Sequence, residues 1–241
     1  YCAAAVHLAI SAAVGAALLA VFWFIWYPAP LFRAVGGHTI FLLLLAVDVA
    51  LGPVMTLIVF RPTKKSLRFD LSAVALIQLF ALVYGVGVLF SGRPVYIAAL
   101  GHRFDVVQAS DVAAADLLAA SARLPLWGPQ WVGTKSAEDN QERERILFSA
   151  VGGVDYGSYP QHHQPLSNMR AEIVRNSLPI ANLSKFNPGG ADDIRSWLKE
   201  HGRNELNTVF QGLKARSEDM TVMIDKKTGD VIGIAPFKPW D

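Results

Sequence analysis

The stretch AVDVALGP places Asp48, Gly52 and Pro53 inside an otherwise apolar run that covers residues 39–60. A carboxylate in such a run could fasten neighbouring helices together, contact the helix of a partner protein, or carry protons. Asp48, Gly52 and Thr56 follow one another at one-turn spacing, so they share one face of a helix. Pro53 has no backbone N–H, which leaves one carbonyl of the preceding turn without its helical donor and favours a kink.

Gln78 and Tyr84, on a third apolar run, are candidate partners for Asp48. At about 1.5 Å per helical residue, both lie within about a turn of the depth of Asp48. We favour the hypothesis that Asp48 fastens the helices to one another. A contact with an incoming membrane helix is the alternative. A proton pathway is the third hypothesis, although such relays use several ionisable groups and here only His7 is of a suitable type.

A stripe of small residues marks the first apolar run, where Ala9, Ala13 and Ala17 recur at four-residue spacing. Helices in lipid associate through close packing of small side chains. The stripe therefore predicts either packing within this chain or a surface that receives a client helix.

The rest of the chain offers little catalytic or ligating chemistry. His162 and His163 are adjacent, so they point in different directions, and no cysteine or spaced acid completes a ligand set. Asp192 and Asp193 open a predicted helix, where acids favour the N-terminal dipole. We expect no catalytic residues, no cofactor and no metal, and hence no enzyme.

Composition separates the chain into two regions. Of its 241 residues 52% are hydrophobic and 17% are charged, below the roughly 25% typical of soluble domains. Three runs, residues 6–27, 39–60 and 71–90, are long and apolar enough to cross a bilayer, which takes about 20 residues. We therefore expect residues 1–92 to form three transmembrane α-helices in contact with the lipid bilayer.

Residues 93–241 are expected to form one extracytoplasmic α+β domain. Residues 91–241 hold 17 Lys and Arg and 18 Asp and Glu, so they carry no basic surface for nucleic acid. Helix signals cover residues 110–120, 137–151 and 188–201, and strand signals cover 95–100, 104–108, 206–213, 220–225 and 231–235. Because helices and strands do not alternate regularly, the pattern is typical of an α+β fold. Segments 125–131 and 156–165 are expected to be exposed loops.

Orientation follows from the short connections. Arg61, Lys64, Lys65 and Arg68 lie between the second and third apolar runs, whereas Arg33 is the only basic residue between the first two. Basic loops stay in the cytoplasm, which places the C-terminal domain outside. The first run is longer than a signal-peptide core, so we expect it to be retained. Because the chain begins at Tyr1, we also expect that a short segment precedes it.

Several motifs together resemble the type IV pilin accessory protein family. They are WYPAPLF (26–32), the block VDVALGPVMTLIVFRPTKKSLRFDLSAVALIQL (47–79), RPVYI (93–97), HRFDVV (102–107) and KARSEDMTVMIDKKTGDVIG (214–233). The resemblance implies a bacterial inner-membrane protein with a periplasmic C-terminal domain. It also implies a non-enzymatic factor whose partner is a type IV pilin or the pilus assembly machinery. The alternative is a membrane-anchored sensor with a ligand-binding periplasmic domain.

The first prediction concerns topology. A reporter that is active only outside the cytoplasm should be active after Asp241 and silent within residues 62–65. Replacing Arg61, Lys64, Lys65 and Arg68 together should mis-orient a fraction of the molecules, because the charge bias is then lost. The opposite reporter pattern would contradict the assignment.

Overall fold

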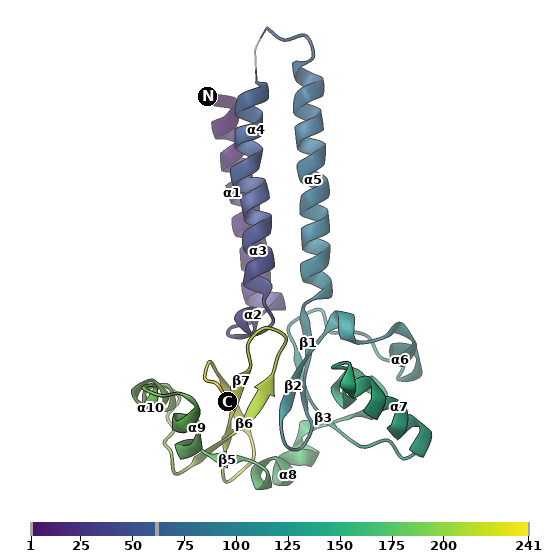
Figure 1. The fold of residues 1–241 in the computed structure, drawn as a ribbon, viewed down its shortest axis with the longest axis vertical. Helices are drawn as coiled ribbons and strands as arrows, with labels where there is room; N and C mark the ends of the chain where they lie inside the picture. The colour runs from purple at the N-terminus through teal and green to yellow at the C-terminus, as the bar shows by residue number, and fades with distance from the viewer. Residues whose placement is uncertain (1, 61–62, 241) are drawn as a thin grey trace. The chain divides into compact units, whose positions relative to one another are not determined.

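The computed structural model describes residues 2–60 and 63–240. The chain divides into two compact units (Figure 1). The helical unit comprises Tyr1–Phe32 and Gly36–Arg93, and the sheet unit comprises Arg33–Val35 and Pro94–Asp241. Each unit is described by itself.

The helical unit contains three long apolar helices. The first comprises α1 (Cys2–Val21) and the π-helical turn η1 (Phe22–Trp26). The second joins α3 (Gly37–Leu45), the π-helical turn η2 (Ala46–Leu51) and α4 (Gly52–Val59), and the third is α5 (Leu67–Ser91). Stretches Ala4–Trp26, Gly37–Val59 and Leu67–Ser91 are long and apolar enough to cross a membrane. The expected order of three long apolar helices followed by a sheet-containing domain is confirmed.

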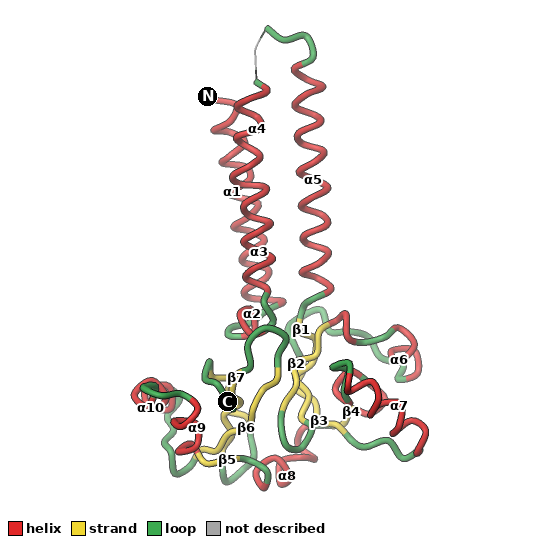
Figure 2. Tube along the Cα trace, in the orientation of Figure 1, coloured by secondary structure: helices red, strands yellow, loops and turns green. Residues whose placement is uncertain are grey.

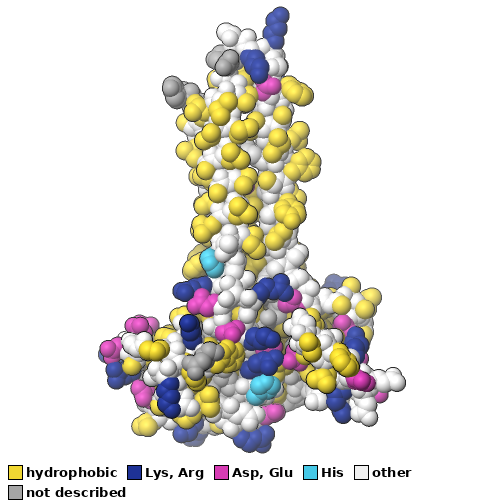
Figure 3. All heavy atoms as spheres, in the orientation of Figure 1, with side chains coloured by type: hydrophobic (Ala, Val, Ile, Leu, Met, Phe, Trp, Pro, Cys, Tyr) yellow, Lys and Arg dark blue, Asp and Glu magenta, His cyan; other side chains and the backbone are white. Residues whose placement is uncertain are grey.

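Apolar side chains cover the visible face of the helical unit, with Lys and Arg gathered at the end that holds the α4–α5 connection (Figure 3). Many of these side chains are exposed: Leu43, Ile58 and Phe80 are 68%, 65% and 73% accessible. Leucine, isoleucine and phenylalanine at such exposure would be costly in water, whereas lipid tails solvate them. The surface therefore fits an apolar solvent better than water.

Glycines let the three helices approach closely. A Cβ built at Gly85 on α5 would lie 2.1 Å from Leu44 Cδ1, and one at Gly15 on α1 would lie 3.0 Å from Leu45 Cδ1. A methyl group at position 85 would collide with the buried Leu44, so the close contact between α3 and α5 requires a glycine there.

Aromatic side chains close one end of the helical unit. Phe22, Tyr27 and Phe41 are buried, and the rings of Phe22 and Phe41 meet edge to face with centroids 5.7 Å apart. The Tyr27 hydroxyl donates a hydrogen bond of 2.5 Å to the Leu89 carbonyl on α5. This bond ties the end of the first apolar helix to the end of the third.

The sheet unit is built on one mixed sheet with the order β4-β3-β1-β2-β6-β7-β8, and β5 pairs with β6 (Figure 2). The strands are β1 (Pro94–Ala99), β2 (Phe104–Gln108), β3 (Gln130–Thr134), β4 (His163–Gln164), β5 (Leu178–Pro179), β6 (Thr208–Lys214), β7 (Met220–Asp225) and β8 (Val231–Ala235). Pairs β1–β3 and β2–β6 are parallel, and the other pairs are antiparallel. The β7–β8 hairpin predicted for residues 220–235 is confirmed.

The helices of the sheet unit are α6 (Ala114–Ala119), α7 (Asn140–Val151), α8 (Arg170–Arg175), α9 (Ile180–Phe186) and α10 (Ala191–Glu200). One core cluster joins α9 and α10 to β6, β7 and β8 through Ile180, Leu183, Ile194, Leu198, Phe210, Met223 and Ala235. Asp192 and Asp193 lie in the first turn of α10, where the dipole argument placed them.

The connection between the first two apolar helices contributes to the sheet unit. The Ala34 carbonyl accepts hydrogen bonds from the backbone N–H groups of Ser217 and Glu218, at 2.9 and 3.0 Å. Arg33 pairs with the Glu218 carboxylate at 2.6 Å. The loop between β6 and β7 therefore holds these residues by backbone and side chain together.

The two loop predictions have different outcomes. Segment 125–131 is a loop as far as residue 129, with Leu126 and Trp127 56% and 78% exposed, and only its last two residues belong to β3. The prediction for segment 156–165 was wrong: it contains two short 3-10 turns and strand β4, and its Tyr159 and His162 are only 4% and 9% exposed. Aromatic residues among Gly and Pro are typical of loops, but in this second segment the rings are buried.

Candidate functional site

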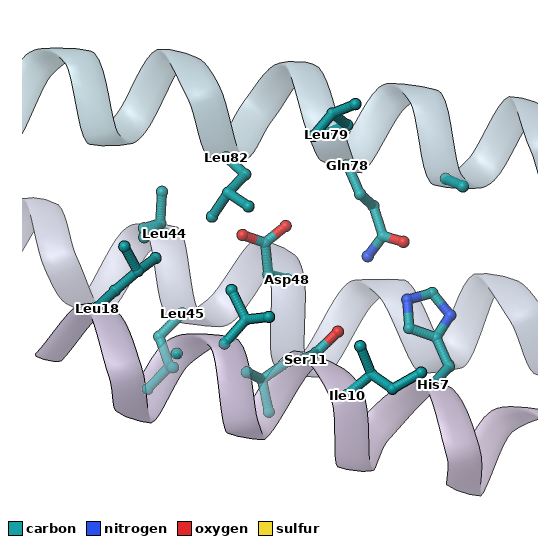
Figure 4. Close-up of a pocket in the computed structure, with 14 residues that line it drawn as sticks. His7, Ile10, Ser11, Leu18, Leu44, Leu45, Asp48, Gln78, Leu79 and Leu82 are labelled. Atoms are coloured by element: carbon teal, nitrogen blue, oxygen red, sulfur yellow. The ribbon is translucent and has the colours of Figure 1, made fainter.

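A pocket of about 220 Å³ lies between the three apolar helices (Figure 4). Residues from α1, from α3 and η2, and from α5 line it: His7, Ile10, Ser11, Val14, Gly15, Leu18, Leu44, Leu45, Asp48, Val49, Ala75, Gln78, Leu79 and Leu82. Most of these side chains are apolar, so the few polar ones define its chemistry.

Asp48 and Gln78 reach into this pocket from facing helices (Figure 4). Asp48 Oδ2 and Gln78 Nε2 are both buried, and neither has a hydrogen-bond partner among the described residues. A buried polar atom without a partner costs about 1–3 kcal/mol. The pocket therefore has a buried carboxyl oxygen on the second helix and a buried amide N–H group on α5, an acceptor and a donor of complementary type.

Gly52 positions Gln78. A Cβ built at Gly52 would lie 1.8 Å from Gln78 Nε2 and 2.8 Å from its Cδ. The amide of Gln78 thus rests directly on the backbone of the second helix, one turn from Asp48. Only a glycine leaves this space open.

The backbone around Asp48 is a π-helical turn. The Gly52 N–H donates to the Val47 carbonyl five residues earlier, and α4 follows with Pro53 in its first turn. Pro53 cannot donate a backbone hydrogen bond, so the ladder changes register beside it. Single π-helical turns of this kind are frequent at functional sites.

Thr56 lies on the same helix but has a different partner. Its side chain is 3% exposed, and its Oγ1 lies 2.6 Å from His7 Nδ1 on α1. The polar face expected on the second helix is therefore shared: Asp48 faces the pocket with Gln78 of α5, and Thr56 pairs with α1.

Other residues singled out from the sequence lie away from the pocket. Ala9, Ala13 and Ala17 are exposed, whereas the partly or fully buried residues of α1 include His7 and Gly15. Tyr84 is 76% exposed and does not approach Asp48, so that proposed pairing was wrong. The alanines had the right spacing for packing, but spacing alone does not tell which face is used.

The basic residues of the α4–α5 connection are exposed where described. Lys64, Lys65 and Arg68 are exposed, and Lys64 Nζ lies 2.5 Å from Asp70 Oδ2. Arg61 lies outside the described residues. The close contact between Leu44 and Gly85 could not be predicted from the sequence, because leucine and glycine are both common in apolar helices.

The adjacent histidines of the sheet unit take separate partners. His163 donates from Nε2 to the Gly157 carbonyl at 2.8 Å, and burial lowers its pKa. His162 Nε2 lies 3.4 Å from the Glu142 carboxylate, which also pairs with Arg145 at 2.7 Å. Among the described residues no group of three or more His, Cys, Asp or Glu side chains could hold a metal ion.

Relatives of known name are similar over most of the chain. A fimbrial assembly protein of serogroup I from Dichelobacter nodosus is 27% identical over 228 residues, which cover 92% of this chain and 89% of that protein. The serogroup E1 protein of the same organism matches with the same identity and coverage. The protein of serogroups C1 and C2 is 35% identical over 94 residues, which cover 38% of this chain and 72% of that protein.

The chain belongs to the family of fimbrial assembly proteins. A match over 92% of the chain takes in parts of both units, since neither unit alone is that long. No family model matches the chain, and no solved structure does.

The contact between Gly52 and Gln78 yields a prediction about stability. Gly52→Leu should lower the stability of the protein in detergent by about 1–3 kcal/mol, the usual cost of overpacking. Gly87→Leu is the matched control, because a Cβ at Gly87 on α5 meets nothing within 4 Å. Thermal unfolding of the purified full-length variants measures both.

Adding Gln78→Ala to Gly52→Leu should recover part of the lost stability, because it removes the colliding amide. Equal melting of the Gly52 and Gly87 variants would contradict the packing described here.

Proposed function

We propose that this fimbrial assembly protein is a non-enzymatic accessory factor for type IV pilus biogenesis, and that it handles or modulates pilin assembly at the bacterial inner membrane. The observation that carries the proposal is the similarity to fimbrial assembly proteins over 92% of the chain. A match of this extent argues for a shared role of the whole architecture rather than of one borrowed domain.

In this proposal the three apolar helices cross the inner membrane and the sheet unit lies in the periplasm. Each helix is long enough to span about 30 Å of hydrocarbon. Exposed Lys64, Lys65 and Arg68 cluster in the connection between the second and third helices, which supports a cytoplasmic position for that connection. With three spans, the C-terminal unit then lies on the other side.

The two units suggest a division of labour. The helical unit would act on the part of the client that lies in the membrane, and the sheet unit on the part that lies outside. Asp48 and Gln78 support this, since polar atoms kept unsatisfied inside an apolar bundle are costly unless they serve a contact. The non-enzymatic assignment rests on the resemblance, because that family has no agreed catalytic residues.

The proposal predicts a physical and a phenotypic link to the pilus. After crosslinking in living cells, full-length tagged protein should be recovered with pilin as the dominant partner, because the two would meet in the same membrane. Deleting the gene should change the number of surface pili, counted by electron microscopy, and a plasmid copy should restore it.

A strain that lacks pilin is the control for the crosslinked band. Unchanged pili in the deletion strain, together with absence of pilin from the crosslinked fraction, would overturn the proposal in favour of a membrane-anchored sensor.

A further inference from the structure

A cavity of about 320 Å³ lies in the sheet unit, where the parallel strands β2 and β6 separate. The two strands pair only through Phe104 with Leu213 and through Asp105 with Lys214. β6 ends at Lys214 whereas β2 continues to Gln108, so the two backbones diverge beyond this last pair. In open sheets with parallel strands, ligands bind in the crevice beyond the carboxyl ends of the strands. The cavity also has the volume of a small-molecule site, which is typically about 300–1,000 Å³.

The turn that follows α7 forms another wall of this cavity. Gly157 allows the turn to lie directly on β1 and β2, since a Cβ built there would lie 2.7 Å from Ala98 Cβ and 3.0 Å from Val107 Cγ2. The next residue, Ser158, lines the cavity and is 5% exposed. Its hydroxyl has no hydrogen-bond partner among the described residues. Because a buried hydroxyl without a partner is costly, this group is a donor available to a molecule in the cavity.

Three aspartates line the cavity, and each of their carboxylate oxygens already accepts a hydrogen bond. Arg103 donates to both oxygens of Asp105, at 2.7 and 3.2 Å, and to one oxygen of Asp155 at 2.9 Å. Arg216 donates to one oxygen of Asp111 at 2.8 Å. The two remaining oxygens accept from the backbone N–H groups of Tyr156 and Gln108. The aspartates are therefore already satisfied, and they do not form a cation site.

The two cations that line the cavity keep donors to spare. Lys214 lies opposite Asp105 across the β2–β6 ladder, but Arg103 already holds both oxygens of that aspartate. The Lys214 ammonium has no ion pair among the residues that the structure describes. Arg216, whose side chain is 63% exposed, donates to Asp111 from Nη2 and retains its other N–H groups. The unused hydrogen-bonding groups of the cavity are therefore mainly donors.

A carboxylate fits these donors, because it only accepts hydrogen bonds and carries a negative charge. It forms charge-assisted hydrogen bonds with both lysine and arginine. The three aspartates are balanced by three cations, so a monoanion is accommodated more easily than a phosphate dianion. Valine side chains supply an apolar part of the wall that suits a short hydrocarbon group: Val106, Val107 and Val154.

We propose that this cavity binds a small organic carboxylate. The carboxylate group accepts hydrogen bonds from Lys214, Arg216 and the Ser158 hydroxyl, and the hydrocarbon part packs against the valines. This inference goes beyond the proposed function, because it assigns a ligand to the sheet unit and requires no contact with pilin.

Calorimetric titration of the purified full-length protein in detergent tests the proposal, with butyrate as the probe. Butyramide is the matched control, since it has the same carbon skeleton without the charge. Inorganic phosphate tests an anion that has no hydrocarbon part. We expect saturable binding of butyrate that weakens as salt is added, because salt screens the attraction between the carboxylate and the two cations. Both other compounds should bind about tenfold more weakly or less.

Variants assign the binding to this cavity. Lys214→Met and Ser158→Ala should each weaken butyrate binding by about threefold or more, the effect of losing one hydrogen bond. Lys214→Arg keeps a charged donor and should retain binding. Lys227→Met is the matched control, because Lys227 is exposed in the turn between β7 and β8 and does not line the cavity. Lys214 is also exposed, so its variants test the proposal even if Ser158→Ala melts early.

Several results would overturn the proposal. They are the absence of saturable butyrate binding, equal binding of butyrate and butyramide, and equal binding of butyrate to the native protein and to Lys214→Met. Tighter binding of phosphate than of butyrate would overturn the choice of a carboxylate as the ligand. None of these results depends on crosslinking to pilin or on the number of pili, so the proposed function is tested separately.

Discussion

The helical unit depends on the energetic cost of placing a carboxyl group in an apolar helix. On insertion scales the cost is about 2.5–3.5 kcal/mol for an acid at the centre of a span. The second apolar helix is organised around this cost: a π-helical turn carries Asp48, and Gly52 admits the Gln78 amide from α5. Since α1 and α5 both pack on this helix, its Asp48 lies in a pocket that all three helices line.

The helical unit is closed at its aromatic end, where the Tyr27 hydroxyl donates to the Leu89 carbonyl, and has a pocket beside Asp48. Leu44 enters the space above Gly85 and draws α3 and α5 together, while His7 and Thr56 join α1 to α4. Neither contact brings α1 to α5. The pocket between the helices is lined mostly by apolar side chains, with Asp48 and Gln78 among them.

The sheet unit is stabilised by hydrophobic clusters and ion pairs. Its hydrophobic clusters lie between the mixed sheet and helices packed on it, and several of its charged groups form ion pairs. Arg103, for example, bridges Asp105 and Asp155 at 2.7 and 2.9 Å, and these carboxylates raise its pKa. This unit therefore has a hydrophobic core of its own.

Much of this architecture could be predicted from the sequence. The three apolar helices, the strands at 104–108, 220–225 and 231–235, and the depth match between Asp48 and Gln78 follow from hydropathy, alternation and rise per residue. Strands β4 and β5 were missed because each pairs through only two residues. The exposure of Ala9, Ala13 and Ala17 could not be predicted, because the face that a small-residue helix buries is decided by its neighbours.

The most direct measurement is the abundance of the Asp48→Leu variant together with the piliation of its host, with Asp48→Asn beside it. If Asp48 meets a client helix, the leucine variant should be as abundant as the native protein, since removing a buried acid eases insertion, yet pili should be few. The asparagine variant should behave as the native protein does. Low abundance of the leucine variant with a proportionate loss of pili would contradict this account, and would show that Asp48 only fastens the three helices together.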